Sequence, residues 1–279
     1  MTFSKKRKND NWKFIIGLFS GIIIILVVLA FSLLSSGVSF GNKIAVIQMS
    51  GTISSSPQLL TESVIPNDIF SMIDKVEEDP SIKGAIFMIN SPGGSVVASR
   101  EIAHAVKEME KPTVCWMADV AASGAYWIAS AADNVYANRM SITGSIGVTA
   151  SYLEFSELFD EYGVTYEQIT SGERKDMGTP FRNMTSDERE RMEYLTSEIF
   201  SYFLSEVVEN RNLTQEQIDQ VIEGDIFLGK DAVSVGLIDS TGTLKDAKDK
   251  AKELAGTENV EFYTLKKKGL GIFDLMGMF

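Results

Sequence analysis

Residues 84–117, GAIFMINSPGGSVVASREIAHAVKEMEKPTVCWM, contain the arrangement that decides the fold. The apolar runs Gly84–Ile89 and Thr113–Met117 are of strand length, and between them Ser95–Glu110 has the apolar spacing of a helix. Because both runs are apolar throughout and do not alternate with polar residues, we expect the strands to be parallel and buried on both faces. The stretch therefore predicts a strand–helix–strand unit of an α/β fold.

The same alternation of strands and helices extends on both sides of this unit. Further strands are predicted at Ile44–Met49, Val135–Ala137, Ile146–Thr149 and Val164–Ile169, and further helices at Asn67–Glu78, Ser123–Ala132 and Tyr152–Tyr162. Beyond these the chain is helical and charged, and two capping-box patterns predict helix starts at Thr185 and Thr214. We expect one domain with a mostly parallel buried sheet and a helical C-terminal layer.

Composition narrows the classes of function. The 279 residues include 26 Lys and Arg against 38 Asp and Glu, a net charge of −12, one Cys and one His. The negative net charge argues against a nucleic-acid partner. Because Cys115 is the only cysteine and His104 the only histidine, a disulfide framework or a Cys- or His-rich metal site is not expected. No dinucleotide fingerprint follows the first strand, and Gly224–Lys230 matches a phosphate loop only up to its lysine, so it predicts a turn that opens a short helix. We expect no metal and no cofactor.

The N-terminal region differs from the rest in charge. Residues 1–34 hold five basic side chains and one acidic one, and Ile15–Leu34 is an uncharged run of 20 residues, long enough as a helix to span roughly 30 Å. It predicts a membrane anchor over 14–38, with a cleaved signal peptide ending near Ser35–Gly37 as the alternative. The cluster Lys5–Lys8 places residues 1–13 in the cytoplasm and residues 39–265 on the outer side of the membrane.

Three segments are candidates for chemistry. Asn90–Ser95 joins a strand to a helix through paired glycines, Ala121–Tyr126 places Ser123 among very small residues, and Ser171–Pro180 carries Lys175. Taken alone, each has an ordinary structural explanation: a tight turn, close helix packing, and a surface lysine.

Together with Thr143–Gly147 and Gly229–Gly236, these segments resemble the signal peptide peptidase A family. Its members are membrane-anchored serine proteases of the Clp-protease/crotonase superfamily, and the likeness covers residues 44–255. The resemblance implies repeated ββα units, Ser123 as the nucleophile, Lys175 as its general base and Ser145 as the residue that orients the lysine. Ala125 stands where the family usually has a second glycine.

The residue types support this assignment independently. A serine hydroxyl needs a base, and since His104 lies upstream on another predicted helix, a lysine is the candidate. Lys175 must be neutral to act as a base, which requires burial away from carboxylates. We therefore expect an extended segment in which Lys175 points inward while Arg174 and Asp176 face solvent. Glu173 lies on the same face as Lys175 and would oppose this. The amides of Gly124 and of Gly93 or Gly94 are expected to stabilise the oxyanion.

The family resemblance also implies substrates and assembly. It implies cleavage of remnant signal peptides and other hydrophobic peptides at the membrane surface, by an octameric ring or dome. As in the half-length members of the family, neighbouring protomers would supply the serine and the lysine of one site. The alternatives are an NfeD-like membrane Ser/Lys protease, a crotonase-type acyl-CoA enzyme and a non-catalytic anchored scaffold. The basic and then apolar tail, residues 266–279, is expected to touch lipid, a neighbour or the active-site groove, or to make no functional contact.

Overall fold

Three long strands form the centre of a mostly parallel sheet: β1 (Asn42–Ser50), β4 (Ile82–Ser91) and β5 (Thr113–Ala122). The computed structural model describes residues 11–35, 41–58 and 61–265. The strand order is β10-β1-β4-β5-β6-β9, with β7 pairing β5 and β8; every pair in this sheet is parallel except β7 with β8. The predicted α/β class and the central strands are confirmed. The shorter strands are β6 (Asn134–Ala137), β7 (Ile142–Gly144), β8 (Ile226–Leu228), β9 (Ser240–Thr241) and β10 (Val260–Leu265).

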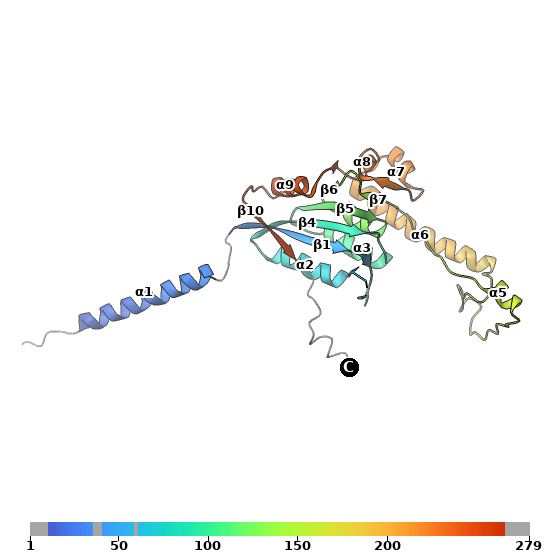
Figure 1. The fold of residues 1–279 in the computed structure, drawn as a ribbon, viewed down its shortest axis with the longest axis horizontal. Coiled ribbons are helices and arrows are strands. Elements are labelled where there is room, and N and C mark those ends of the chain that lie inside the picture. The colour runs from blue at the N-terminus through green and yellow to red at the C-terminus, as the bar shows by residue number, and fades with distance from the viewer. Residues whose placement is uncertain (1–10, 36–40, 59–60, 266–279) are drawn as a thin grey trace, which may run out of the picture. The chain divides into compact units, whose positions relative to one another are not determined.

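Alternate residues of these strands are buried on opposite faces of the sheet, as the continuous apolar runs predict. Ala45, Phe87 and Cys115 belong to the larger core, whereas Ile44 and Ile86 belong to a smaller core on the other face. Helices α2 (Pro66–Glu78), α3 (Val96–Lys107) and α4 (Gly124–Ser130) contribute to the larger core. Helix α9 (Leu244–Leu254) covers the other face through Ala247 and Ala251, and Figure 1 shows it across the sheet from α2 and α3.

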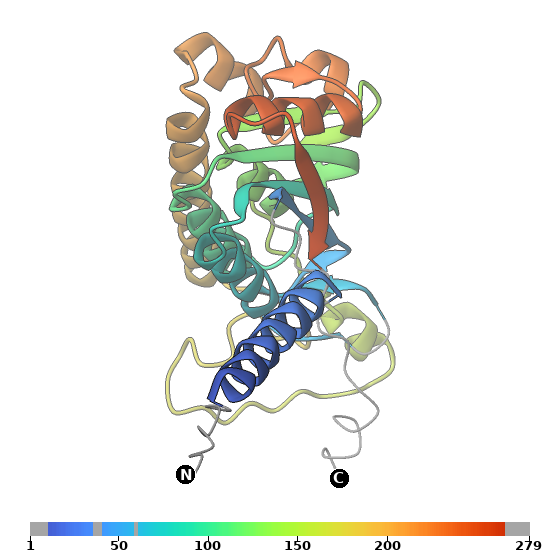
Figure 2. The same cartoon turned by 90° about the vertical axis from the view of Figure 1, so that its left-hand side faces the viewer.

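The longest helix of this unit, α6 (Ser186–Arg211), extends beyond the sheet. Its N-terminus has the predicted capping box of Thr185 and Glu188, and its 26 residues span about 39 Å. Phe203 and Val207, in its C-terminal half, are buried in the larger core. Figure 1 shows the N-terminal half leaving the sheet with the preceding segment at its far end, and Figure 2 shows that segment as a wide loop below the sheet. We call residues 150–185, which include α5 (Ser156–Glu161), the arm.

Two of the predicted strands and part of one predicted helix are wrong, and all lie in or next to the arm. Ile146–Thr149 and Val164–Ile169 have no strand structure, and the helix predicted over Tyr152–Tyr162 is limited to α5. Val164 and Ile169 are exposed, Ile169 to 99%. An apolar run forms a buried strand only where a neighbouring strand can pair with it, and the arm lies away from the sheet.

The remaining elements complete the C-terminal part of the fold. Helix α7 (Gln215–Val221) begins with the predicted capping box at Thr214, and α8 (Gly229–Ala232) is the short helix predicted to follow the Gly224–Lys230 turn. Two short strands, β2 (Thr52–Ile53) and β3 (Ser63–Val64), form a separate parallel pair.

The chain divides into two units, Met1–Gly41 and Asn42–Phe279. The first contains helix α1 (Asn11–Ser35), which covers the apolar run predicted to be an anchor. Across the described residues, no helix combines the length and apolar character that a membrane crossing requires. The predictions for residues 1–10 and for the tail, residues 266–279, fall outside the described part of the chain.

Candidate active site at the ends of β5 and β7

Ser123 occupies the sharp corner between β5 and α4. Its backbone angles are φ 54° and ψ −129°, and its side chain is partly exposed. An L-residue rarely adopts this conformation, which costs of order 1–3 kcal/mol and persists only where the surrounding structure imposes it. Here the Ser123 amide donates a hydrogen bond to the carbonyl oxygen of Gly144 (2.9 Å), and the Ser123 carbonyl accepts one from the amide of Trp127 (3.0 Å). A strained serine at a strand-to-helix corner presents its hydroxyl at the sheet edge.

Ser145, next to Ser123, also has a positive φ angle. Among the described residues, the non-glycine residues with positive φ are Ser123, Ser145 (φ 52°) and Asn212. Asn212 is the left-handed cap of α6, a place where asparagine is common. In the parallel pairing of β5 with β7, Ala122 lies opposite Gly144, so the residues that follow each, Ser123 and Ser145, are neighbours at one sheet edge. The structure therefore brings these two predicted site residues together.

The predicted glycines pack directly against this corner. Gly93 has φ 98°, and a Cβ atom there would lie 2.8 Å from the carbonyl oxygen of Ala122 and 2.9 Å from the amide nitrogen of Gly124. Gly94 lies beside β2: a Cβ atom there would be 2.1 Å from the carbonyl oxygen of Ile53. Any side chain at Gly93 would push the turn after β4 away from Ser123.

The amides of these glycines differ in availability. The Gly93 amide donates to the Ser91 hydroxyl (3.1 Å), so it is already engaged. Gly124 is the first residue of α4, where an amide has no carbonyl of the preceding turn to bond. The Gly94 nitrogen is 3.6 Å from the position that a Cβ on Gly124 would take. Gly94 and Gly124 are thus better placed than Gly93 to stabilise a developing negative charge.

Sequence reasoning missed three residues that support the corner. Ser91 binds the Gly93 amide, and the Asn90 side-chain oxygen accepts a hydrogen bond from the Val120 amide (3.1 Å). Ser99 is fully buried in α3, and a Cβ on Gly124 would lie 2.1 Å from its hydroxyl oxygen. Asn90 and Ser91 lie in the Asn90–Ser95 segment, which the sequence identified as a candidate site. Nothing in the sequence distinguishes Ser99 from other positions inside a helix.

Lys175 was predicted to point inward from an extended segment, and the structure differs. It lies in a turn, with its amide bonded to the carbonyl oxygen of Gly172 (3.1 Å), and its side chain is exposed and does not point inward from an extended segment. Asp176, expected to be solvated, has a side chain only 13% exposed. The reason is that arm residues form ion pairs: Arg174 binds Asp187, and Arg182 binds Asp176.

The Lys175 segment is tied to the opposite end of α6 from the end that packs beside Ser123. Arg174 is bound to Asp187 in the first turn of α6, and Asp176 is linked to Glu188 in the same turn through Arg182. Phe203 lies 15 residues after Glu188 on the same helix. It stacks on Trp127, which is one turn after Ser123, with ring centroids 4.3 Å apart. Fifteen helical residues span about 22 Å, so the Lys175 segment is tied to α6 about 22 Å of helix from the place where α6 packs against α4.

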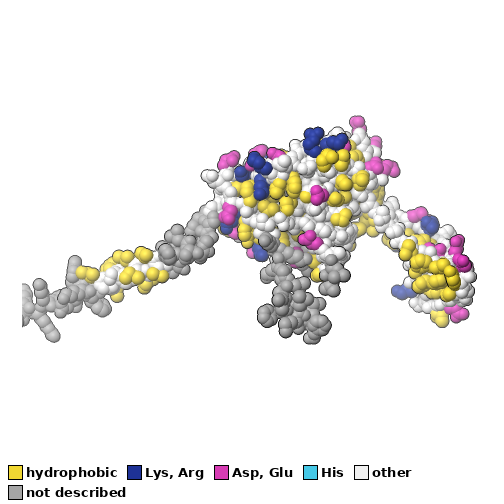
Figure 3. All heavy atoms as spheres, in the orientation of Figure 1, with side chains coloured by type: hydrophobic (Ala, Val, Ile, Leu, Met, Phe, Trp, Pro, Cys, Tyr) yellow, Lys and Arg dark blue, Asp and Glu magenta, His cyan; other side chains and the backbone are white. Residues whose placement is uncertain are grey.

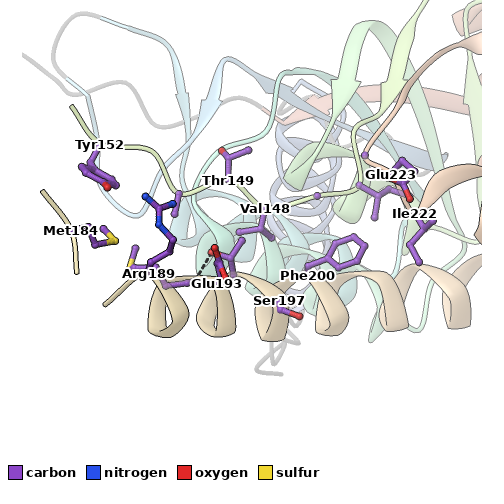
Figure 4. Close-up of a pocket in the computed structure, with 16 residues that line it drawn as sticks. Val148, Thr149, Tyr152, Met184, Arg189, Glu193, Ser197, Phe200, Ile222 and Glu223 are labelled. Carbon is purple, nitrogen blue, oxygen red and sulfur yellow. Dashed lines mark hydrogen bonds between the residues drawn. The ribbon is translucent and has the colours of Figure 1, made fainter. Parts of the chain in front are cut away.

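A pocket of about 630 Å³ begins next to Ser145 and follows α6 toward the arm. In Figure 4, Val148 and Thr149 lie on one side, Phe200 and Ser197 project from α6 on the other, and Arg189 and Met184 lie near the arm end. Its lining is mainly apolar with a few charged groups, which suits apolar peptide side chains.

The arm exposes large apolar side chains. Figure 3 shows them gathered on the part of the molecule that holds α5. They are Tyr152, Leu153, Phe155, Leu158, Tyr162, Val164, Tyr166, Ile169 and Phe181. Apolar patches of this kind mark surfaces that become covered by another molecule or by lipid.

Comparisons with known proteins agree with this architecture. Residues 105–258 match the model of peptidase family S49, and residues 47–150 match that of Clp protease. The chain is similar to the 1510-N membrane-bound stomatin-specific protease, solved as a lysine-to-alanine mutant in complex with a substrate peptide (14% identity, TM-score 0.54, covering 86% of this chain and all of that one). At this identity the likeness concerns the fold.

Curated relatives are more similar in sequence. A presumed protease of Methanocaldococcus jannaschii, MJ0651, is 38% identical over 72% of this chain, and the chloroplastic serine protease SPPA of Arabidopsis thaliana is 32% identical over 84%. The aligned part spans 66% of the first relative and 36% of the second. The family inferred from the Asn90, Ser123 and Lys175 segments is confirmed: the chain belongs to peptidase family S49, the signal peptide peptidase A family of serine proteases.

Proposed function

We propose that the chain is a membrane-anchored endopeptidase whose site is formed by Ser123 of one protomer and Lys175 of its neighbour. The observation that carries the proposal is the corner at Ser123. A strained, partly exposed serine lies beside Ser145 and next to the amides of Gly94 and Gly124. This arrangement provides a nucleophile and an oxyanion site, and it lacks only a base.

Acyl transfer follows from these groups. The neutral amine of the neighbour's Lys175 accepts the proton of the Ser123 hydroxyl as the serine oxygen attacks a peptide carbonyl. The amides of Gly94 and Gly124 stabilise the resulting oxyanion, and the lysine passes the proton to the leaving amine. Water then hydrolyses the ester by the same steps. Ser145, adjacent to Ser123, accepts a hydrogen bond from the lysine and orients its amine.

The arm supports an arrangement between protomers. The Lys175 segment is tied to the first turn of α6, about 22 Å of helix from the contact of Phe203 with Trp127 of α4, which supports a base supplied by a neighbouring protomer. The exposed apolar residues of the arm, including Ile169 and Leu153, would be covered in a closed ring of subunits. A ring or dome in which each arm reaches the next protomer satisfies both conditions, and the family resemblance favours eight subunits.

The anchor and the substrate are further parts of the proposal. The uncharged run Ile15–Leu34 after the cluster Lys5–Lys8 supports a single-pass anchor with the peptidase domain outside the cytoplasm. The mainly apolar pocket next to Ser145 supports hydrophobic peptides, such as signal-peptide remnants, as substrates.

A peptidase assay of the assembled protein, combined with labelling by a serine-directed inhibitor, tests the dyad. We expect Ser123→Ala to lose activity by about 10³-fold or more and to lose the label, and Lys175→Ala to lose about 10²-fold or more. Met140→Ala, an exposed change outside the arm, serves as the control. Label retained in Ser123→Ala, or near-normal activity in Lys175→Ala, would show that the assigned residues are wrong.

A further inference from the structure

Arg182 joins the segment that carries Lys175 to the first turn of α6. Its guanidinium binds the Asp176 carboxylate through Nε (3.1 Å) and one terminal nitrogen (2.8 Å). It also binds the Glu188 carboxylate through both terminal nitrogens (2.7 and 2.9 Å), and it donates to the Asn183 carbonyl oxygen (3.1 Å). These five bonds use all five N–H groups of the side chain.

This cluster is largely shielded from water. The side chains of Asp176 and Glu188 are 13% and 3% exposed, and that of Arg182 is 25% exposed. Glu188 is also the capping-box residue of α6, since its carboxylate accepts the Thr185 amide (3.0 Å). The arginine thus fixes Asp176 relative to the rigid start of a long helix. A bidentate arginine pair fixes orientation as well as distance, which a lysine cannot do.

Lys175 lies between two residues held in this way. Arg174, on its other side, makes a bidentate contact with Asp187 (2.7 and 2.8 Å), but both side chains of that pair are about 60% exposed. The Arg182–Asp176 pair is less exposed, so it is the stronger constraint. With both neighbours tied to α6, the backbone at Lys175 has little freedom, although its side chain projects into solvent.

We infer that Arg182 is a positioning residue that holds the Lys175 backbone so that the amine meets the serine of the next protomer. This inference rests on the proposed role of Lys175. The physical reason is that a base must lie within hydrogen-bond distance of the hydroxyl, and a displacement of about 1 Å can cost about 10²-fold in rate.

Arg182→Gln is the direct test. We expect kcat to fall by about 10- to 100-fold with little change in KM, because substrate binding does not involve the cluster. Arg182→Lys, which keeps the charge but not the fork, should lose part of this activity. Arg191→Gln, an exposed arginine on the same helix outside the cluster, should retain normal kcat.

Mixed assemblies separate positioning from a general structural role. In a mixture of Lys175→Ala with Ser123→Ala protomers, the second supplies the lysine. Adding Arg182→Gln to the lysine-supplying protomer should lower the activity of the mixture by about 10- to 100-fold, whereas adding it to the serine-supplying protomer should leave the activity within about twofold.

Each other outcome is decisive. Normal kcat in Arg182→Gln, an equal loss in both mixtures, or a loss that parallels a smaller assembly mass would overturn the positioning role while leaving the dyad intact. An active Lys175→Ala enzyme would instead refute the proposed function itself.

Discussion

The amide of Ser123 donates a 2.9 Å hydrogen bond to the carbonyl oxygen of Gly144, the residue before Ser145. This bond continues the pairing of β5 with β7 by one residue past the strand end, and it holds both serines in positive-φ conformations. The sheet itself therefore imposes the geometry of the candidate nucleophile, and the strain is balanced by the packing of β5 and α4.

The strain at Ser123 predicts an unusual order of stability. Ser123→Gly should be about 1 kcal/mol more stable than Ser123→Ala, because glycine adopts φ 54° without a Cβ clash. Both variants should lack peptidase activity. Denaturant midpoints measure the difference. At Ser71, an exposed position inside α2, the order should be reversed, since alanine favours a helix. The same order at both positions would contradict strain at Ser123.

Gly93 predicts a steric effect on the same corner. Gly93→Ala places a Cβ 2.8 Å from the Ala122 carbonyl oxygen at φ 98°, so we expect a loss of about 2 kcal/mol or more in stability, together with most of the activity. Thermal unfolding measures the first effect and the peptidase assay the second. Gly172→Ala, with no atom within 4 Å of the added Cβ, is the stability control. Equal stability of the two variants would show that Gly93 is not needed for close packing.

The fold was more predictable from the sequence than the site. Continuous apolar runs such as Gly84–Ile89 identify buried strands because both faces of this sheet are covered. The same signal was misleading at Val164–Ile169, where the apolar side chains are exposed on the arm. A run of apolar residues indicates burial, but it does not say whether the cover is the same chain or another molecule.

The site was predictable in part for a related reason. Ser123, Ser145, Gly93, Gly94 and Gly124 lie at neighbouring strand ends, where short-range sequence patterns correspond to local geometry. The orientation of Lys175 depends on ion pairs of Arg174 and Arg182 with α6, which no local pattern encodes. The extended segment predicted for Lys175 was wrong because these contacts hold it in a turn.

The exposed arm predicts a specific effect on assembly. Ile169→Ser should weaken association, because burying this side chain contributes about 2 kcal/mol, or roughly 30-fold in the dissociation constant of one interface. Mass measured over a dilution series tests this. Met140→Ser, an exposed apolar residue outside the arm, should leave the mass unchanged. Unaltered assembly of Ile169→Ser would remove this residue from the interface.

The Arg182 cluster predicts how the arm responds to acid. Hydrogen bonds from Arg182 and from the Thr185 amide lower the pKa of Glu188 from 4.5 to about 2, and Arg182 also lowers the pKa of Asp176. Because these pKa values are lowered in the folded state, the ion pairs stabilise the arm above pH 4.5, and this contribution is lost as the pH falls toward about 2.

Pepsin cleavage of the arm measures this loss, since pepsin acts throughout that pH range. We expect cleavage to accelerate below pH 4.5, relative to cleavage of an unfolded reference peptide. In Glu188→Gln the arm should already be susceptible at pH 4.5 and change less on further acidification. A pH response identical in both proteins would contradict the role of the cluster.

The most direct test of the central claim mixes inactive protomers. Ser123→Ala and Lys175→Ala proteins are dissociated, combined in equal amounts, reassembled and assayed for peptidase activity. If neighbouring protomers supply the serine and the lysine, random assembly should restore about one quarter of the wild-type activity, because one in four interfaces has both groups. Each protein treated alone should stay inactive. No recovery in a mixture that reaches the wild-type mass would contradict a site shared between protomers.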